Sequence, residues 1–155
     1  MVIRHEGAEV GFYGCIAGKG LFDYTQGEKL RAFTTAIGEE LSAVGYRGWY
    51  DTDYILAKDG QFSPTEANLR RTSMSYVVDL AKLLYGDNWQ DLVSIRTNDK
   101  FIRQNLYGVT YSELKDGLSD IMFPIDQAKE GVIITESMRS KFGRGKFGYT
   151  IFGDS

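Results

Sequence analysis

The dipeptide Asp59-Gly60 lies between two runs of strand-forming residues, and it constrains the fold more than any other short feature of the chain. Asp-Gly is typical of a two-residue type I′ turn, because both central positions of that turn need a positive φ. We therefore predict strands over residues 49–57 and 62–67, joined as a hairpin. The turn also determines which residues face each other across the ribbon.

In this register, oxygen-bearing side chains converge on one face of the hairpin. Asp53 is opposite Glu66, and Asp51 is opposite Asn68. Like charges directly opposite one another destabilise a strand pair by up to about 1 kcal/mol. Carboxylate and amide oxygens are ligands for Mg²⁺ or Mn²⁺, so a cation that binds between them would reverse the sign of this interaction. The face therefore predicts a metal site that binds phosphates, and the alternative is a solvated polar face that protects an edge strand from aggregation.

Towards the turn, the same predicted face continues with Ile55 and Pro64. Proline lacks an N–H group, and in this register the missing group points away from the partner strand. Pro64 therefore indicates an edge strand or a bulge at this position.

Composition and charge narrow the classes of function. The 155 residues fit one domain, and a net charge of −3 provides no general field that would attract nucleic acid. No apolar run reaches the roughly 18 residues of a membrane span, and the first ten residues are too polar for a signal peptide. We expect a cytoplasmic protein with neither nucleic acid nor membrane as a partner.

Cysteine and histidine are each present once. Cys15 lies in the apolar run GFYGCIAG, so we expect it to be buried as a small hydrophobic residue, and no disulfide can form within the chain. His5 lies near the N-terminus, where a catalytic role is not expected. Without a catalytic His5, histidine-based triads are not expected, and one histidine with one cysteine provides too few ligands for an ordinary zinc site.

Helical and strand patterns alternate along the rest of the chain. Capping boxes at Thr25 to Glu28 and at Thr110 to Glu113 indicate two helix starts. We predict helices over 27–44, 74–85 and from 110 onward, and strands over 9–16, 92–96, 101–104, 131–135 and 145–153. This order is typical of an α+β fold in which helices pack on a mostly antiparallel sheet.

The order of motifs around the hairpin resembles the ATP-grasp superfamily of carboxylate-amine ligases. In that family a helix ending in Gly-Tyr/Phe-x-Gly leads into a strand with a metal-binding Asp, and the next strand ends in Glu-x-Asn. The segments GYRGWYDTDYIL and EANLR match this order. The resemblance covers about residues 9–85. It implies that residues 1–86 form the C-terminal subdomain of the ATP-grasp module and that residues 87–155 form an appended α/β region packed on the same domain.

The resemblance implies a role for each polar residue of the face. Asp53 and Glu66 would hold the Mg²⁺ (or Mn²⁺) ions that bridge the phosphates of ATP, and Asn68 would complete the shell of the second ion. Asp51 stands where some family members carry a basic residue, so their substrate contact is not carried over to this chain.

The resemblance also suggests residues that contact the substrates. Arg70 or Arg71 would contact the carboxylate substrate or its phosphorylated form, and the alternative for each is a surface arginine. Ile55 would lie against the adenine of ATP, and ordinary core packing is the alternative.

The implied reaction is ATP-dependent formation of an amide or peptide bond. A small-molecule carboxylate would be phosphorylated to an acyl phosphate, which an amine or amino acid then attacks. The N-terminal half of the module has no counterpart in this sequence, so we expect the chain alone to be inactive and a missing half or a second chain to be its partner. Apolar surface left uncovered would also allow homo-oligomers. The alternative function is a non-catalytic binding or assembly domain that keeps the hairpin as a scaffold.

Two glycine-rich basic segments are further candidates for a phosphate site. GCIAGKG, Gly14–Gly20, lacks the spacing and the Ser/Thr of a P-loop, so we interpret it as a flexible loop. FGRGK, Phe142–Lys146, is interpreted as a basic hairpin loop.

Overall fold

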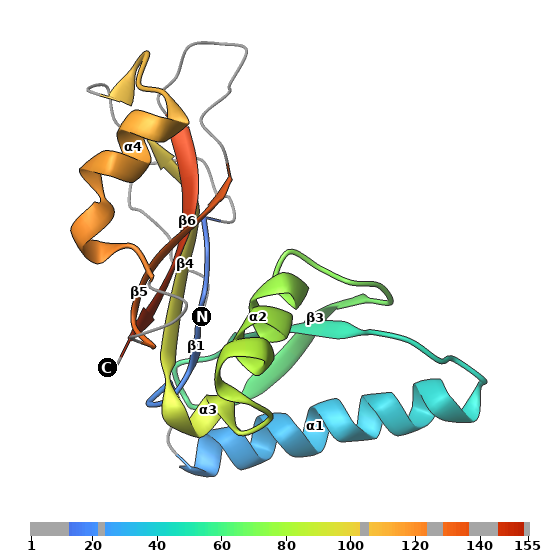
Figure 1. The fold of residues 1–155 in the computed structure, drawn as a ribbon. Helices are drawn as coiled ribbons and strands as arrows, with labels where there is room; N and C mark the ends of the chain where they lie inside the picture. The colour runs from blue at the N-terminus through green and yellow to red at the C-terminus, as the bar shows by residue number, and fades with distance from the viewer. Residues whose placement is uncertain (1–12, 22–23, 103–105, 124–128, 137–145, 154–155) are drawn as a thin grey trace. The chain divides into compact units, whose positions relative to one another are not determined.

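The computed structural model describes residues 13–21, 24–102, 106–123, 129–136 and 146–153 (Figure 1). The chain forms two compact units: a central unit, Phe22–Asp79, and a flanking unit made of Met1–Leu21 and Leu80–Ser155. The strands pair antiparallel in both sheets, which confirms the predicted α+β class with helices and mostly antiparallel sheet. Among the described helices, none is both long enough and apolar enough to cross a membrane.

The flanking unit is built on a four-stranded antiparallel sheet. The strand order is β1-β4-β6-β5, with bounds Ile16–Gly18, Ser94–Ile102, Lys146–Gly153 and Gly131–Glu136. Because β1 pairs with β4, the first described strand belongs to the same sheet as the C-terminal strands. The predicted division between residues 86 and 87 is not one of the boundaries of these units and stays a prediction.

Part of the core of the flanking unit lies on the face of the sheet that carries Ile95 and Phe152. Ile95 of β4 pairs with Phe152 of β6, and both side chains are buried. The ring of Tyr85 stacks on Phe152 with centroids 5.9 Å apart, and Phe123 meets the same ring edge-on at 5.7 Å. In the described part of the chain after residue 74, the structure contains the helices α2 (Ser75–Tyr85), α3 (Trp89–Leu92) and α4 (Tyr111–Gly117) and the 3₁₀ helix η2 (Ser119–Ile121).

Cys15 is buried beside β4, as predicted. Its N–H donates to Thr97 Oγ1 at 3.0 Å, and the Thr97 hydroxyl donates to the Cys15 sulfur at 3.7 Å. Burial is the main cause that raises the pKa of the Cys15 thiol, which favours the protonated, unreactive form. The neighbouring residues Ile16–Gly18 form β1, so the interpretation of the whole of Gly14–Gly20 as a loop is wrong for these three residues.

Most predicted elements of the flanking unit are present, and two of the predicted strands form a single strand. The capping box at Thr110 is confirmed, because Glu113 N–H donates to Thr110 Oγ1 at 3.2 Å and Thr110 N–H donates to Glu113 Oε2 at 2.8 Å. The two predicted strands over 92–96 and 101–104 are a single strand, β4, with an irregularity after Asn98. Such an irregularity breaks the alternation of side chains without ending the strand. His5, residues 9–12 and residues 142–145 lie outside the described part of the chain.

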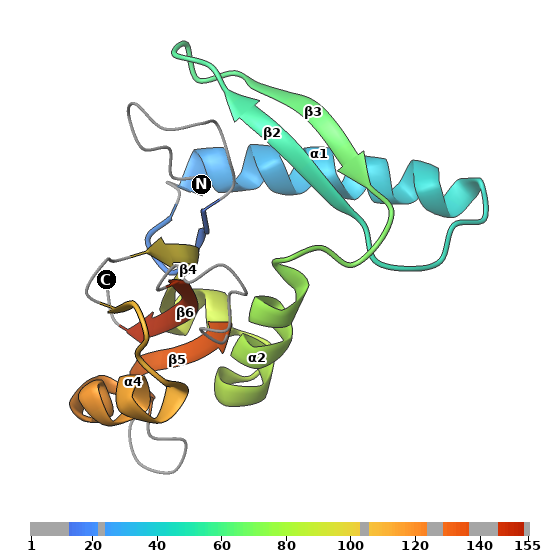
Figure 2. The same ribbon diagram turned by 90° about the horizontal axis from the view of Figure 1, so that it is seen from above.

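The central unit consists mainly of one long helix and the hairpin. Helix α1 (Tyr24–Ala43) lies on one side of the ribbon formed by β2 (Asp51–Leu56) and β3 (Phe62–Asn68), and the ribbon crosses the helix obliquely (Figures 1 and 2). The helix begins three residues before the predicted start, so Thr25 lies inside it and is not its N-cap.

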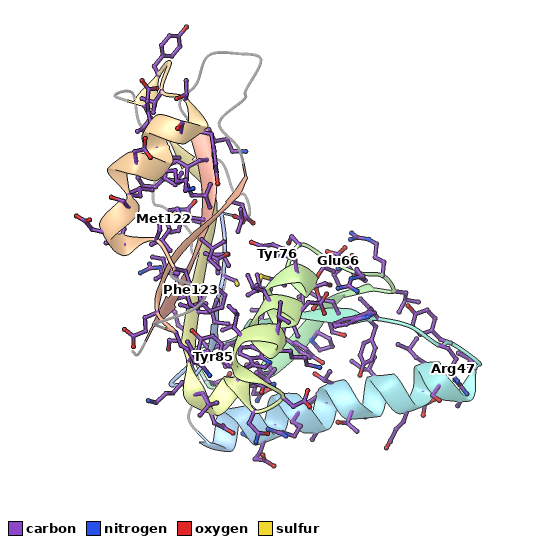
Figure 3. The ribbon with its side chains drawn as sticks, viewed as in Figure 1. Arg47, Glu66, Tyr76, Tyr85, Met122 and Phe123 are labelled. Carbon is purple, nitrogen blue, oxygen red and sulfur yellow. The ribbon has the colours of Figure 1, made fainter. Side chains whose placement is uncertain are left out.

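Helix α1 ends in a Schellman motif at Gly45, where φ is +89°. Tyr46 N–H donates to the Leu41 carbonyl at 2.9 Å, and Gly45 N–H donates to the Ser42 carbonyl at 3.0 Å. Arg47 lies beyond the last turn (Figure 3), and its guanidinium donates to the same Ser42 carbonyl at 2.9 Å. A cation is favourable at this end of the helix dipole. The motif reverses the chain so that β2 can return along α1.

Tyrosines of the hairpin segment join the ribbon to α1. The Tyr50 hydroxyl donates to the Thr34 carbonyl at 2.7 Å, and the Tyr54 hydroxyl lies 3.3 Å from Thr34 Oγ1. Tyr54 also meets Phe33 edge-on, with ring centroids 6.4 Å apart. A Cβ at Gly38 would lie only 2.4 Å from the Tyr50 hydroxyl oxygen, so this close approach requires glycine.

We expect Gly38→Ala to lower the free energy of unfolding by about 1–2 kcal/mol, although alanine favours helices. The added methyl group would displace the Tyr50 hydroxyl from the Thr34 carbonyl. Thermal unfolding followed by circular dichroism measures the change. Gly27→Ala is the matched control in the same helix, because no described atom lies within 4 Å of its added methyl group. This control should be neutral or stabilising, and equal gains for both variants would contradict the prediction.

Candidate metal and phosphate site on the hairpin

The ladder of the hairpin pairs the residues that the sequence predicts. Asp53 is opposite Glu66, and Asp51 is opposite Asn68. Because side chains alternate between the two faces of a ribbon, all four lie on one face. Figure 3 shows Glu66 on the side of the ribbon that is turned away from α1. The predicted register is confirmed for these two pairs.

The turn differs from the predicted one. Ala57 N–H donates to the Gln61 carbonyl at 2.8 Å, and Gly60 N–H donates to the Ala57 carbonyl at 3.0 Å. Three residues therefore form the loop, and only Gly60 among them has a positive φ, +82°. The predicted type I′ turn is wrong, because Asp59 does not have a positive φ. The geometry is that of a type I turn followed by a left-handed glycine, which is the common form of a three-residue hairpin loop.

A β-bulge at Thr65 restores the predicted pairing. The three-residue loop offsets the strands by one residue between the turn and the bulge. Thr65 is the extra residue of β3, and its hydroxyl donates to the Asp53 carbonyl at 3.1 Å. The loop shifts the register by one residue and the bulge shifts it back, so Asp53 lies opposite Glu66.

The same offset changes the neighbours of Ile55. Ile55 is opposite Ser63, and Pro64 is opposite Tyr54, so the predicted placement of Pro64 beside Ile55 on the metal face is wrong. The irregularity that Pro64 indicates is confirmed, because the bulge follows it directly. Ile55 is 58% exposed, which does not fit the alternative of core packing.

The carboxylates of the face are close enough to affect one another. Partial burial raises the pKa of Asp53, and the charges of Asp51 and Glu66 raise it further. Asp53 and Glu66 are exposed, and Asp51 is half-buried. The repulsion that the register predicts is therefore present, and a cation that binds there would relieve it.

The oxygen-bearing side chains of this face suit a cation that also binds a phosphate. Among the described residues, no group of three or more His, Cys, Asp or Glu is placed so that it could hold a metal ion. The candidate set is smaller, with two carboxylates, Asp53 and Glu66, and the amide of Asn68. Mg²⁺ is usually bound through one or two carboxylates, while waters and substrate phosphates complete its shell. These three residues therefore fit a cation that binds together with a phosphate.

The two arginines after β3 have different surroundings. Arg71 forms an ion pair with Asp79, and its Cζ lies 4.8 Å from the centroid of the Trp49 ring. Arg70 is exposed, and its Nη1 donates to the Arg71 carbonyl at 3.2 Å. The sequence alone predicts no role for Trp49 or Asp79, and Asp79 lies eight positions after Arg71, within the next helix.

Comparison with known proteins gives no match for this chain. No protein-family model matches it, and neither a curated protein nor a solved structure matches it significantly. The functional argument therefore depends on the hairpin and its surroundings.

Proposed function

We propose that the hairpin face is the cation and phosphate site of an ATP-dependent carboxylate-amine ligase. The observation that carries this proposal is the register that places Asp53 opposite Glu66 with Asn68 on the same face. Mg²⁺ or Mn²⁺ bound there would neutralise the charge of the phosphates during phosphoryl transfer. The order of motifs around the hairpin, which resembles the ATP-grasp ligases, supports the same class of reaction.

The proposed reaction transfers the γ-phosphoryl group of ATP to a carboxylate, which gives ADP and an acyl phosphate. An amine then attacks the acyl carbon and displaces phosphate, which leaves an amide or peptide bond. Arg70 would bind the carboxylate or its phosphorylated form, because a guanidinium binds both in a bidentate manner. The contacts of Arg71 with Asp79 and Trp49 favour Arg70 over Arg71 for this role. Ile55, exposed on the face of Asp53, is the proposed contact for adenine.

The proposed partner is a nucleotide-binding half of the module, in the same protein or in a second chain. None of the described side chains from Gln26 to Met74 is buried. A two-stranded ribbon and one helix bury little apolar surface by themselves. The large apolar side chains that remain exposed in this unit are Phe33, Val44, Trp49, Ile55, Leu56, Leu69 and Tyr76.

The same exposed apolar side chains also support a second candidate function. A non-catalytic binding or assembly domain would keep the hairpin as a scaffold and use this surface for a protein partner. Its carboxylates would then serve as solvated charges, and cation binding would not depend on Glu66.

Titration of the full chain with Mn²⁺, followed by electron paramagnetic resonance of the free ion, tests the proposal. We expect Glu66→Gln to weaken Mn²⁺ binding by at least about 100-fold, because loss of a group that merely supports a ligand already weakens binding by up to that factor. Glu39→Gln, the same change at an exposed position of α1, should leave binding unchanged. Binding that is equal in both variants would exclude the ligase site and leave the assembly domain.

A further inference from the structure

Arg71 lies just beyond the open end of the β2–β3 ladder. The last pair of the ladder is Asp51 with Asn68. Trp49 precedes Asp51 by two residues, and Arg71 follows Asn68 by three. The contact between the Trp49 ring and the Arg71 guanidinium therefore joins the segment that enters the ribbon to the segment that leaves it.

Both partners of this contact are also held from outside the ribbon. The Tyr46 hydroxyl, directly after α1, donates to the Trp49 carbonyl at 2.6 Å. The guanidinium of Arg71 pairs with Asp79 of α2. A continuous series of contacts thus runs from the end of α1 across the open end of the ribbon to α2.

Arginine suits this position because its planar guanidinium can stack on a ring and pair with a carboxylate at the same time. A lysine ammonium can take either contact but lacks the planar group that makes both together. Arg71 could reach a substrate only by giving up the Trp49 stack or the Asp79 pair.

Asp53 and Glu66, the two proposed cation ligands, lie in a weak part of the ladder. On the turn side of Asp53 and Glu66 lies the bulge at Thr65, and on the other side only two pairs remain before the open end. Short two-stranded ribbons have little stability of their own and open from their ends. The spacing of Asp53 and Glu66 therefore depends on what holds the open end together.

We propose that Arg71 is a positioning residue. Its stack on Trp49 and its ion pair with Asp79 close the open end of the ribbon and hold Asp53 and Glu66 at the spacing at which they share one cation. This inference rests on the proposed function of the hairpin face as a cation site.

The first test is whether the contact forms in solution. The chain has two tryptophans, Trp49 and Trp89, and fluorine NMR of the fluorotryptophan-labelled chain observes each separately. Arg71→Ala should shift the Trp49 resonance and leave that of Trp89 in place. Arg31→Ala, which removes an exposed guanidinium from α1, should shift neither. If the Trp49 resonance does not shift in Arg71→Ala, the proposal is overturned.

The second test is the affinity for Mn²⁺. Arg71→Ala should weaken binding about tenfold, as does loss of other groups that orient metal ligands. Removal of a positive charge by itself would strengthen the binding of a cation, so the direction of the change separates positioning from simple electrostatics. Trp49→Leu, which changes no charge, should weaken binding similarly, and Arg71→Lys should restore it only in part. Arg31→Ala controls for net charge and should not weaken binding.

The outcomes separate this inference from the proposed function. If Glu66→Gln abolishes Mn²⁺ binding while Arg71→Ala and Trp49→Leu leave it unchanged, the positioning role is wrong and the cation site stands. If Glu66→Gln has no effect, the proposed function fails. The contact that closes the ribbon is then decided without metal by the fluorine NMR spectra, and a Trp49 resonance that does not shift in Arg71→Ala overturns the positioning role.

Discussion

If the hairpin face is the proposed ligase site, turnover of ATP is expected to fall by at least about 100-fold in Glu66→Gln and in Asp53→Asn. Each change keeps the shape of the side chain and removes the charge that would hold the cation at the phosphates. Both side chains are exposed on the face turned away from α1, so the packing of the ribbon is not affected. Release of ADP, measured in the presence of the carboxylate and the amine, gives the rate.

Asp59→Asn is the matched control for this prediction. It removes one carboxylate from the loop of the same hairpin, and an asparagine oxygen can still accept the hydrogen bond that Asp59 Oδ1 receives from Gln61 N–H at 3.1 Å. Its turnover should remain near that of the unchanged protein. Near-normal ADP release by Asp53→Asn and Glu66→Gln would end the ligase proposal, and an equal loss in Asp59→Asn would show that net charge, not the site, sets the rate.

The hairpin shows why a register can be predicted when its turn is not. An Asp-Gly pair suits a two-residue type I′ turn, and it equally suits a type I turn followed by a left-handed glycine. The sequence does not distinguish these turns, and the bulge at Thr65 has no local signal except the neighbouring Pro64. Asp53 lies opposite Glu66 because the two offsets cancel. The predicted register is therefore correct only because the bulge, which the prediction does not include, compensates for the different turn.

Local signals predict several helix ends, although not the start of α1, where Thr25 lies inside the helix. Gly45 and Gly86 both have a positive φ after a predicted helix, and the capping box at Thr110 forms as its spacing predicts. These signals are local, since each depends on residues within one helical turn. Strand β4 was predicted as two strands because the irregularity after Asn98 interrupts its alternation. Its pairing with β1 could not be predicted, since no local pattern specifies partners distant in sequence.

The roles of the two arginines illustrate what sequence spacing leaves open. Arg70 and Arg71 are adjacent, and either could be assigned to a substrate from the motif alone. Only the neighbours in space distinguish them, because Trp49 and Asp79 both contact Arg71. A site built from such contacts therefore needs the fold before its residues can be given separate roles.

The effect of Asp53 on stability is expected to reverse when a divalent cation is added. Without a cation, Asp53→Asn should be more stable by about 0.5 kcal/mol, because it removes a charge that is repelled by Asp51 and Glu66. Since the folded pKa of Asp53 lies above its unfolded value, the penalty is absent below the unfolded pKa. It grows as the pH rises to the folded pKa and is complete above it. At near-neutral pH the variant should therefore melt about 1–2 °C higher.

With Mn²⁺ at about 100 times its dissociation constant, the unchanged protein should gain about 2.7 kcal/mol from binding. This gain corresponds to about 5–10 °C in Tm for a chain of this length, and Asp53→Asn should gain little of it. Differential scanning calorimetry with and without Mn²⁺ measures both differences, and Asp59→Asn should respond to Mn²⁺ like the unchanged protein. A solvated polar face predicts that Asp53→Asn stays the more stable chain in both conditions. A cation held by Asp53 makes the order of stability cross, because the charge that weakens the empty ribbon is then the charge that binds the ion.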